Sequence, residues 1–337
     1  MRIAIDAMGG DHGPRVLIDG ALAAARHLDL GLLLVGSQAA LEAELARYPD
    51  APRLDVRVID APDVVGMGES PTAALRRKPR ASVRVAAEAV ARGEAVALVS
   101  IGHTGASVMA AYSAFGMIPG VDRPALALAI PTREGSAVLL DAGANVECRP
   151  QHLLQFAIMG SAYARVALGV DRPRVGLLSI GEEESKGTEV VREAHQLLKS
   201  APLNFIGNIE ARDVYAGHAD VIVCDGFTGN VVLKISEGLV DTIEALLGEE
   251  LSRTFSGMVG SLLSRRAFRR FRRRVDYSEY GGAPLLGVGK LCIVGHGRSS
   301  AKAVRNAVAT AYRFAAHQLI DRVEQDIAAA AAVQSRD

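Results

Sequence analysis

The sequence predicts a doubly wound α/β protein, with a mostly parallel β-sheet between layers of helices. The prediction rests on a unit that recurs along the chain: a short aliphatic run, a glycine-rich turn and then an amphipathic, alanine-rich segment. Strands that alternate with helices pair in parallel, and uninterrupted apolar strands suit a sheet covered on both faces. The units span residues 2–25, 30–48, 95–115, 137–164, 174–198, 219–239 and 291–314.

In chain order, the strands are expected at RIAID, LGLLLVG, AVALVSIG, AVLLDAG, RVGLLSIG, ADVIVCDG and LCIVGHG, each at the start of its unit. The segment after each turn is amphipathic, which is typical of a helix with one buried face. The units have no fixed period, so a solenoid of repeats is not expected. We expect a single catalytic domain over residues 1–330, with two intimate lobes around a crevice as the alternative, and a loose tail at 328–337.

The composition fits a large buried core and local rather than global charge. Of the 337 residues, 49% are hydrophobic, and the formal net charge is zero, so electrostatic attraction must come from local patches. The three cysteines have no metal-ligand spacing and form no disulfide framework, which predicts buried thiols in a reducing cytoplasm. Neither a secretory signal nor a run of about 18 apolar residues is found. We therefore expect a cytoplasmic protein.

The loops that follow the strands should line one crevice, because ligands bind at the carboxyl ends of such sheets. In GHGRSSAKAV, Gly297 allows close approach of the backbone and Ser299 or Ser300 can cap the next helix. A helix N-terminus attracts phosphate, and the guanidinium group of Arg298 adds a positive charge with several hydrogen-bond donors. An ordinary serine-capped turn is the alternative interpretation of this segment.

The segment CDGFTGNVVLK carries more polar groups than a turn requires. Asp225, Thr228 and Asn230 surround two glycines, of which Gly229 is the second, and Lys234 follows one helical turn later. This concentration of polar side chains after a predicted strand favours a functional interpretation.

Three further loops hold candidate binding or catalytic residues. In SIGHTGAS, His103 and Thr104 lie between glycines, although a histidine in such a loop is often only a structural hydrogen-bonding group. In SIGEEESKGTE, the acids Glu182–Glu184 could equally be the solvated start of a helix. The candidates from these loops and from MGGDHGP, besides His103 and Thr104, are Gly9, Gly10, Asp11, His12, Gly105 and Lys186.

Several familiar motifs are absent. The sequence has no G-x-G-x-x-G fingerprint with a following acid, no G-x-x-x-x-G-K-[ST] loop, no G-x-S-x-G elbow and no cysteine in a catalytic frame. These absences argue against a nucleotide site and against a covalent enzyme nucleophile. The residues alone predict a protein that binds an anionic, phosphate-bearing substrate and transfers a group on it.

The sequence resembles the PlsX family, the bacterial phosphate acyltransferases, through motifs that occur in order from about Met1 to about Glu324. They include MRIAIDAMGGDHGP, PTAALRRKPRAS, LLDAGANVECRPQHLLQFAIMGS, NFIGNIEARD, ADVIVCDGFTGNVVLKISEG and YSEYGGAPLLG. The resemblance implies transfer of a fatty acyl group from acyl carrier protein to inorganic phosphate, which feeds acylation of glycerol 3-phosphate in phospholipid synthesis. It also implies a fold similar to phosphotransacetylases and to isocitrate- and isopropylmalate-type dehydrogenases, a homodimer, and no cofactor or metal.

The resemblance and the motifs together suggest direct transfer in a ternary complex, without an acyl-enzyme. Phosphate would be held by the Gly297 and Gly229 loops, and its charge would be met by Lys186, Lys234 or the pair Arg76 and Arg77. His103 or His12 would polarise the thioester or protonate the thiolate, and Asn145, in the DAGAN motif, is a further binding candidate. The family pattern has Asn where this chain has His103, and either side chain can donate a hydrogen bond.

Three alternatives remain at this point. A phosphotransacetylase would use a short-chain acyl-CoA, and a dehydrogenase of related fold would need a nicotinamide cofactor. A nucleic-acid-binding regulator would rest on the arginine cluster alone. If the chain is a phosphate acyltransferase, as the resemblance implies, no nucleic acid is expected as a partner.

The segment from Leu262 to Gly282 carries the arginine cluster, in which seven of the ten residues from Arg265 to Arg274 are arginine. Its apolar positions fall on two opposite helical faces, so a break near 264–266 and a projecting helical hairpin near 250–275 are expected. The hairpin would dock the acidic carrier protein and touch an anionic membrane, beside a membrane-bound glycerol 3-phosphate acyltransferase; a solvated basic helix is the alternative. The docking candidates are Arg265, Arg266, Arg269, Arg270, Arg272 and Arg273, and the membrane candidates are Met258, Val259, Leu262 and Leu263.

Overall fold

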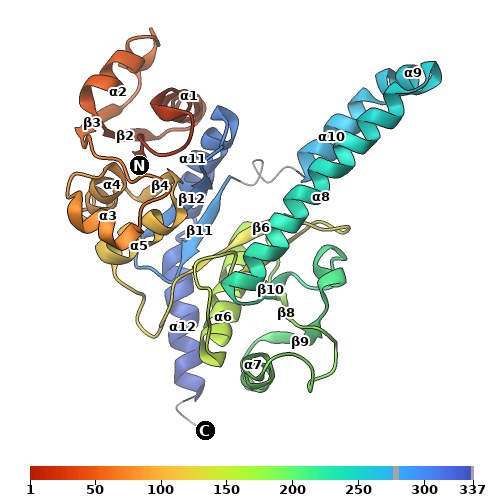
Figure 1. Ribbon diagram of the computed structural model, residues 1–337. Coiled ribbons are helices and arrows are strands. Elements are labelled where there is room, and N and C mark those ends of the chain that lie inside the picture. The colour runs from red at the N-terminus through yellow and green to blue at the C-terminus, as the bar shows by residue number, and fades with distance from the viewer. Residues whose placement is uncertain (276–280, 335–337) are drawn as a thin grey trace.

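The computed structural model describes residues 1–275 and 281–334 (Figure 1). The family-like motif within 276–280 and the end of the expected tail, 335–337, lie outside the described residues, as does the side chain of Arg273. The part of the tail that is described, up to 334, is helical.

Within the described residues the strands form two sheets, and the predicted α/β class is confirmed. In the first sheet, β11 runs antiparallel to both of its neighbours and the strands from β3 to β12 are parallel. The order across this sheet is β3 (Val56–Asp60), β2 (Gly31–Gly36), β1 (Arg2–Asp6), β4 (Ala97–Gly102), β12 (Leu291–His296), β11 (Ala283–Leu286) and β5 (Ala125–Leu126).

The second sheet is also parallel except at one edge, where β6 runs antiparallel to β7. Its order is β6 (Leu128–Pro131), β7 (Ser136–Leu140), β10 (Val221–Val223), β8 (Arg174–Leu178) and β9 (Asn204–Ile209). The chain passes from one sheet to the other at Ala127, whose N–H donates to the Pro284 carbonyl of the first sheet at 3.0 Å. The two sheets therefore meet where the short strands β5 and β6 follow each other.

Helices cover both faces of the first sheet because its side chains alternate between two cores. Ile3 and Ile5 belong to the core that includes the buried faces of α1 and α11, whereas Ala4 between them belongs to the core that includes α4 and α5. Here α1 is Gly13–Ala25, α4 is Ser82–Ala91, α5 is Thr104–Phe115 and α11 is Ala301–Ala316. The remaining helices of the body are α2 (Gln38–Leu45), α3 (Pro71–Arg77), α6 (Pro150–Ala167), α7 (Glu189–Ser200) and α12 (Leu319–Gln334), with 3-10 turns at Ala51–Arg53 and Ala211–Tyr215.

Three helices form an arm that projects from the body: α8 (Gly226–Ser252), α9 (Phe255–Leu263) and α10 (Arg265–Val275), as Figure 1 shows. The expected break lies at Ser264, and α10 returns beside α8. The arm begins earlier than the predicted residue 250, because α8 leaves the sheet as one continuous helix about 40 Å long. Among the described helices, none is both long enough and apolar enough to cross a bilayer.

Two arginines of α10 brace the arm. Arg272 forms a bidentate pair with Glu244 of α8, with nitrogen–oxygen distances of 2.9 and 2.7 Å. Arg274 donates to the carbonyl oxygens of Thr132 and Arg133, beyond β6, at 2.6 and 2.8 Å. Not every residue of the arginine cluster is therefore free for docking. Arg272 has a structural partner within the arm, which the sequence did not predict.

Candidate active site

A cavity of about 330 Å³ lies between the two sheets, near the carboxyl ends of β4 and β12. Its wall combines residues from α5, α8, α11 and β12 with the loop after β7. Polar side chains gather on part of this wall, namely Thr104, Asn230, Lys234, Glu237, His296 and Ser299. Two segments singled out in the sequence, CDGFTGNVVLK and GHGRSSAKAV, therefore meet in one cleft, as expected for loops at the carboxyl edge.

The buried carboxylate of Asp141 fixes the loop after β7 and, through it, the start of α8. It accepts hydrogen bonds from the N–H groups of Leu126, Gly143 and Asn145 at 2.9, 3.1 and 2.7 Å. Burial raises the pKa of this carboxyl group, and the surrounding N–H donors act in the opposite direction. A Cβ atom at Gly229 would lie only 1.9 Å from the Asp141 carbonyl oxygen, so α8 can dock here only with glycine at this position.

Docked in this way, α8 turns one face toward the cavity. Asn230, Lys234 and Glu237 follow one another at helical spacing, and all three line the cleft. Asp225 caps the helix by accepting from the backbone N–H of Thr228 at 2.7 Å and from its hydroxyl at 2.9 Å. The N–H of Gly229 donates to the Asp225 carbonyl at 2.9 Å. Asp225 and Gly229 thus build the helix start, and the predicted phosphate contact of the Gly229 N–H does not fit this geometry.

The ammonium group of Lys234 reaches across the cleft to the loop after β12. Its Nζ lies 3.4 Å from Nε2 of His296 and 2.8 Å from a carboxylate oxygen of Glu237. The N–H of Arg298 approaches His296 Nδ1 at 3.3 Å. Lys234 can only donate and a neutral imidazole accepts at one nitrogen, so the ring satisfies one of these two contacts at a time. The ammonium group of Lys234 brings a positive charge to this part of the cavity, which suits an anion.

His296 is the site residue that the sequence analysis missed. It stands in GHGRSSAKAV between two glycines at the end of a strand, and that position is the signal that could have identified it. The two neighbouring serines have different hydrogen-bond partners. The hydroxyl of Ser299 donates to the His296 carbonyl at 2.6 Å, and Ser300 caps α11 by accepting from the Ala303 N–H at 3.3 Å. Arg298 is exposed beside them.

The loop after β1 does not line this cavity, and Gly9 and Gly10 line a second, smaller pocket instead. A Cβ atom at Gly9 would lie 2.2 Å from the Ile101 carbonyl oxygen, so the loop after β1 packs directly on β4. The Asp11 N–H donates to the Gly297 carbonyl at 2.9 Å, which joins this loop to the loop after β12. Gly10 adopts a φ of +81°, which favours glycine. His12 precedes α1 without a side-chain capping bond.

His103 acts as a helix cap that faces away from the large cavity. Its Nδ1 accepts from the Ala106 N–H at 3.4 Å, and its Nε2 lies 3.1 Å from the Glu69 carbonyl oxygen, to which it donates. The imidazole lines a separate pocket of about 140 Å³ above the buried Asp6, whereas Thr104 lines the large cavity. With both nitrogens engaged, the ring positions the loop at 66–70 and is not directed at the cleft; Gly105 packs against Pro71 of α3.

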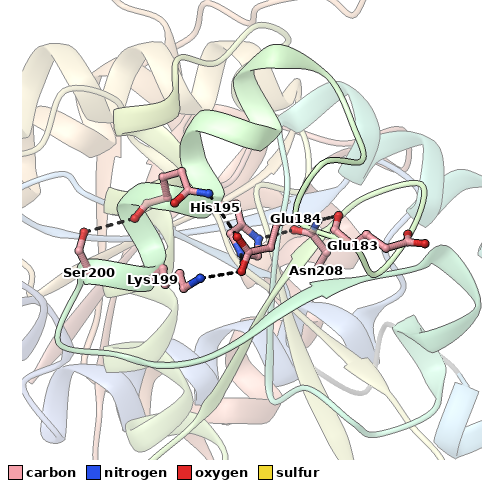
Figure 2. Close-up of polar contacts among 7 residues, drawn as sticks. Glu183, Glu184, His195, Lys199, Ser200 and Asn208 are labelled. Atoms are coloured by element: carbon pink, nitrogen blue, oxygen red, sulfur yellow. Dashed lines mark hydrogen bonds and ion pairs between the residues drawn. The ribbon is translucent and has the colours of Figure 1, made fainter.

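Lys186 sits on a loop that is held by a chain of polar contacts between α7 and β9 (Figure 2). His195 Nδ1 lies 2.9 Å from the Asn208 side-chain oxygen, and the Asn208 amide donates to the Glu183 carbonyl at 2.9 Å. The same carbonyl accepts from the Lys186 N–H at 3.0 Å. Glu184 pairs with Lys199 at 2.7 Å, and this contact lowers the pKa of the Glu184 carboxyl. Lys186 is exposed on the loop after β8 and is not part of the cavity wall.

The other candidates from the sequence do not line the cavity. Arg76 and Arg77 are exposed on α3 and do not line the cavity. The Asn145 amide donates to the Pro124 carbonyl at 2.7 Å and to Asp141 at 2.9 Å, so it holds the loop after β7 in place. The structure therefore groups Thr104, Asn230, Lys234 and Ser299 with His296, and places Arg76, Arg77 and Lys186 elsewhere.

No thiol in the chain is prepared for nucleophilic attack. Burial raises the pKa of Cys148 and of Cys292 to about 12, and it also raises that of Cys224, so the reactive thiolate is disfavoured at all three. In the described ranges, no group of three or more His, Cys, Asp or Glu side chains is placed to hold a metal ion.

Solved structures with the same fold define the class. A phosphotransacetylase from Streptococcus pyogenes superposes with a TM-score of 0.64 at 19% identity, covering 95% of this chain and 94% of that one. A 4-hydroxythreonine-4-phosphate dehydrogenase from Klebsiella pneumoniae gives 0.53 at 14% identity, covering 94% and 98%. The fold is thus the α/β fold of phosphotransacetylases and related dehydrogenases, with a donor-lined cavity between its two sheets.

Sequence similarity identifies the family within that class. The family described as fatty acid synthesis protein matches residues 1–322. The phosphate acyltransferase of Nitratidesulfovibrio vulgaris (strain DP4) is 52% identical over 328 residues, which cover 97% of this chain and 95% of that protein. The chain belongs to the phosphate acyltransferase family, the PlsX family, and is a transferase.

The Lys234 ammonium group predicts a measurable anion site. Replacing Lys234 with Met should weaken binding of inorganic phosphate by about 10- to 100-fold, because one charge-assisted hydrogen bond contributes about 1.5–3 kcal/mol. Isothermal titration calorimetry with phosphate alone measures this effect. Lys290→Met removes an exposed lysine outside the cavity and is the matched control. Equal dissociation constants for both variants and the parent protein would contradict the assignment.

Proposed function

We propose that this protein transfers a long-chain acyl group from acyl-acyl carrier protein to inorganic phosphate, giving acyl-phosphate for acylation of glycerol 3-phosphate. The observation that carries the proposal is the composition of the cavity: Lys234 and His296 meet in one part of it, and aliphatic side chains such as Leu126, Leu128 and Leu233 line another part. An anion and an acyl chain are the two chemical parts that must meet in such a reaction. Membership of the phosphate acyltransferase family supports this assignment.

The transfer needs no enzyme nucleophile. An oxygen of the hydrogen phosphate dianion attacks the thioester carbonyl, a C–O bond forms, and the C–S bond then breaks with its electron pair on sulfur. The proton of the phosphate ends on the sulfur, so the products are acyl-phosphate and free thiol with the total charge unchanged. We assign this transfer to His296: an unprotonated Nε2 accepts the phosphate proton and then donates it to the sulfur, and this nitrogen faces the same part of the cavity as Lys234.

The rate enhancement would come from positioning the two reactants and from electrostatic stabilisation of the tetrahedral intermediate. Holding two reactants in attack geometry lowers a barrier by roughly 7–11 kcal/mol. A donor aimed at the oxyanion of the tetrahedral intermediate adds about 3–4 kcal/mol. Asn230 and Thr104 lie on the cavity wall with Lys234 and are the residues that we assign to the oxyanion and the phosphate. The pocket beside His103 is separate and takes no part in this step.

The decisive experiment measures release of free carrier protein from a long-chain acyl-carrier-protein thioester. We expect release that depends on added phosphate and forms stoichiometric acyl-phosphate, with little turnover of acetyl-CoA. Preference for acetyl-CoA would instead favour a phosphotransacetylase, the activity named for the Streptococcus pyogenes structure. A radiolabelled acyl-enzyme trapped without phosphate would rule out direct transfer.

The exposed face of α10 is the surface that we assign to the carrier protein. Arg265, Arg266, Arg269 and Arg270 are exposed, and within the described residues their guanidinium groups take part in none of the ion pairs. An acidic partner would be steered to such a patch. Arg272, which is bound to Glu244, helps to keep α10 against α8.

Replacing these four arginines with alanine should raise KM for the acyl-carrier-protein thioester at least tenfold, because rim charges control encounter with an acidic partner. KM for phosphate should stay unchanged, since the cavity lies at the other end of α8. Steady-state kinetics at low ionic strength separates the two constants. The matched control neutralises four exposed arginines of the body, Arg47, Arg53, Arg57 and Arg92. Equal effects of both sets on the thioester KM would refute docking at α10.

The tip of the arm is proposed as a membrane contact. Phe255 and Leu263 are 79% and 80% exposed, and Met258, Val259 and Leu262 are exposed beside them. Apolar tips next to basic helices bind anionic membranes. Co-flotation with vesicles that contain anionic lipid, lost in Leu262→Asp, tests this contact. It would bring the product close to a membrane-bound glycerol 3-phosphate acyltransferase.

A homodimer would cover the apolar stripe along α8. Phe227, Val231, Ile235 and Leu239 recur every four residues on this helix and are all exposed. A continuous apolar stripe of this length is unusual on the surface of a monomer. Sedimentation velocity should therefore give twice the chain mass of 35.5 kDa.

A further inference from the structure

The cavity wall away from the donors is apolar and is lined in part by very small side chains. Leu126, Leu128, Leu233 and Val294 form its bulkier portion. Ala303 and Ala307 of α11 complete it, and both are buried, with exposed fractions of 7% and 1%. They lie four residues apart and so occupy the same face of the helix. The space along this face exists because neither residue extends beyond Cβ.

The two alanines lie at different depths. Ser300 caps α11 at the carboxyl edge of the first sheet, next to Ser299 and His296. At 1.5 Å per residue, Ala307 lies about 6 Å farther along the helix axis than Ala303. Ala303 is therefore near the donors of the cleft, and Ala307 is farther from them.

Small residues on β11 contribute to the same space. Gly282 and Ala283 line the cavity at the start of that strand. Gly282 has a φ of +82°, and a Cβ atom there would lie 2.8 Å from Ile293 Cγ2, so the strand cannot carry a side chain at this position without a shift. Backbone and methyl groups from α11 and from the start of β11 thus form part of the cavity wall.

We propose that Ala303 and Ala307 determine which acyl chain lengths the enzyme accepts. The inference rests on the proposed function and names the residues that set its substrate specificity. The first methylenes of the acyl chain run along α11, past Ala303 and toward Ala307, while the carbonyl stays at the donors. A cavity of about 330 Å³ equals about eleven water volumes, which holds the anion, the thioester carbonyl and the nearest methylenes.

The test is a chain-length profile of kcat/KM, measured with acyl-carrier-protein thioesters from C8 to C18. Valine at either position fills space that about two methylenes would occupy. Each methylene excluded from an apolar site changes affinity by about fourfold, so Ala307→Val, which excludes about two, should lower the C16-to-C8 ratio by about 15-fold. Ala303→Val, nearer the donors, should lower kcat/KM at every length. Ala307→Gly should leave the C16-to-C8 ratio at or above its parental value.

The control is Ala309→Val, which places the same β-branched residue on α11 at a partly exposed position outside the cavity wall. It should leave the profile unchanged. Urea denaturation of each variant shows whether it is folded, and Ala303→Val and Ala307→Gly keep the test open if Ala307→Val does not fold.

The outcomes separate this inference from the proposed function. If the parent protein transfers no acyl group at any length, the proposed function is wrong. If the parent protein is active and the Ala303 and Ala307 variants are folded with the parental profile, the chain does not run along α11. Dissociation constants for phosphate should be the same in all of these variants, because the donors are not changed.

Discussion

The buried carboxylate of Asp141 is the interaction on which the geometry of the cleft depends. It follows β7 in the second sheet and accepts the N–H of Leu126, the last residue of β5 in the first sheet, so it ties the two sheets together where the chain crosses between them. The same carboxylate shapes the loop on which Gly226 and Gly229 rest, with no room for a Cβ atom at either glycine. The direction in which α8 leaves the sheet follows from this packing.

Because α8 is continuous from the cleft to the tip of the arm, one helix connects the surfaces to which we assign different roles. Its first turns present Asn230 and Lys234 to the cavity, and its exposed stripe begins at Phe227 on another face. Glu244, farther along, holds Arg272 and with it the basic helix α10. The positions of the proposed anion site, the basic surface and the apolar tip are therefore related by one helix, and a shift at Gly229 would move all three.

In the first sheet, Asp6 is a second buried carboxylate at the end of a strand, and it also accepts hydrogen bonds from neighbouring elements. The hydroxyls of Ser82 and Ser100 donate to it at 2.6 and 2.9 Å, while burial raises its pKa. This contact joins β1, β4 and the start of α4 beneath the Gly9 loop. The helix cap made by His103 lies beside it: its Nδ1 accepts a backbone N–H, as the side-chain oxygen of an asparagine can at the start of a helix.

The sequence by itself determined the α/β class, the family, the break at Ser264 and the two loops that meet in the cleft. These follow from periodicity, glycine turns and motifs, which are local in the chain. Only the tertiary structure decided that the strands divide between two sheets, that His296 faces Lys234 while His103 faces a different pocket, and that Arg272 is held by Glu244. It also decided where Ala303 and Ala307 leave space. Such facts depend on which side chains meet across distances of tens or hundreds of residues, and a pattern along one segment carries no information about the partner that it will meet.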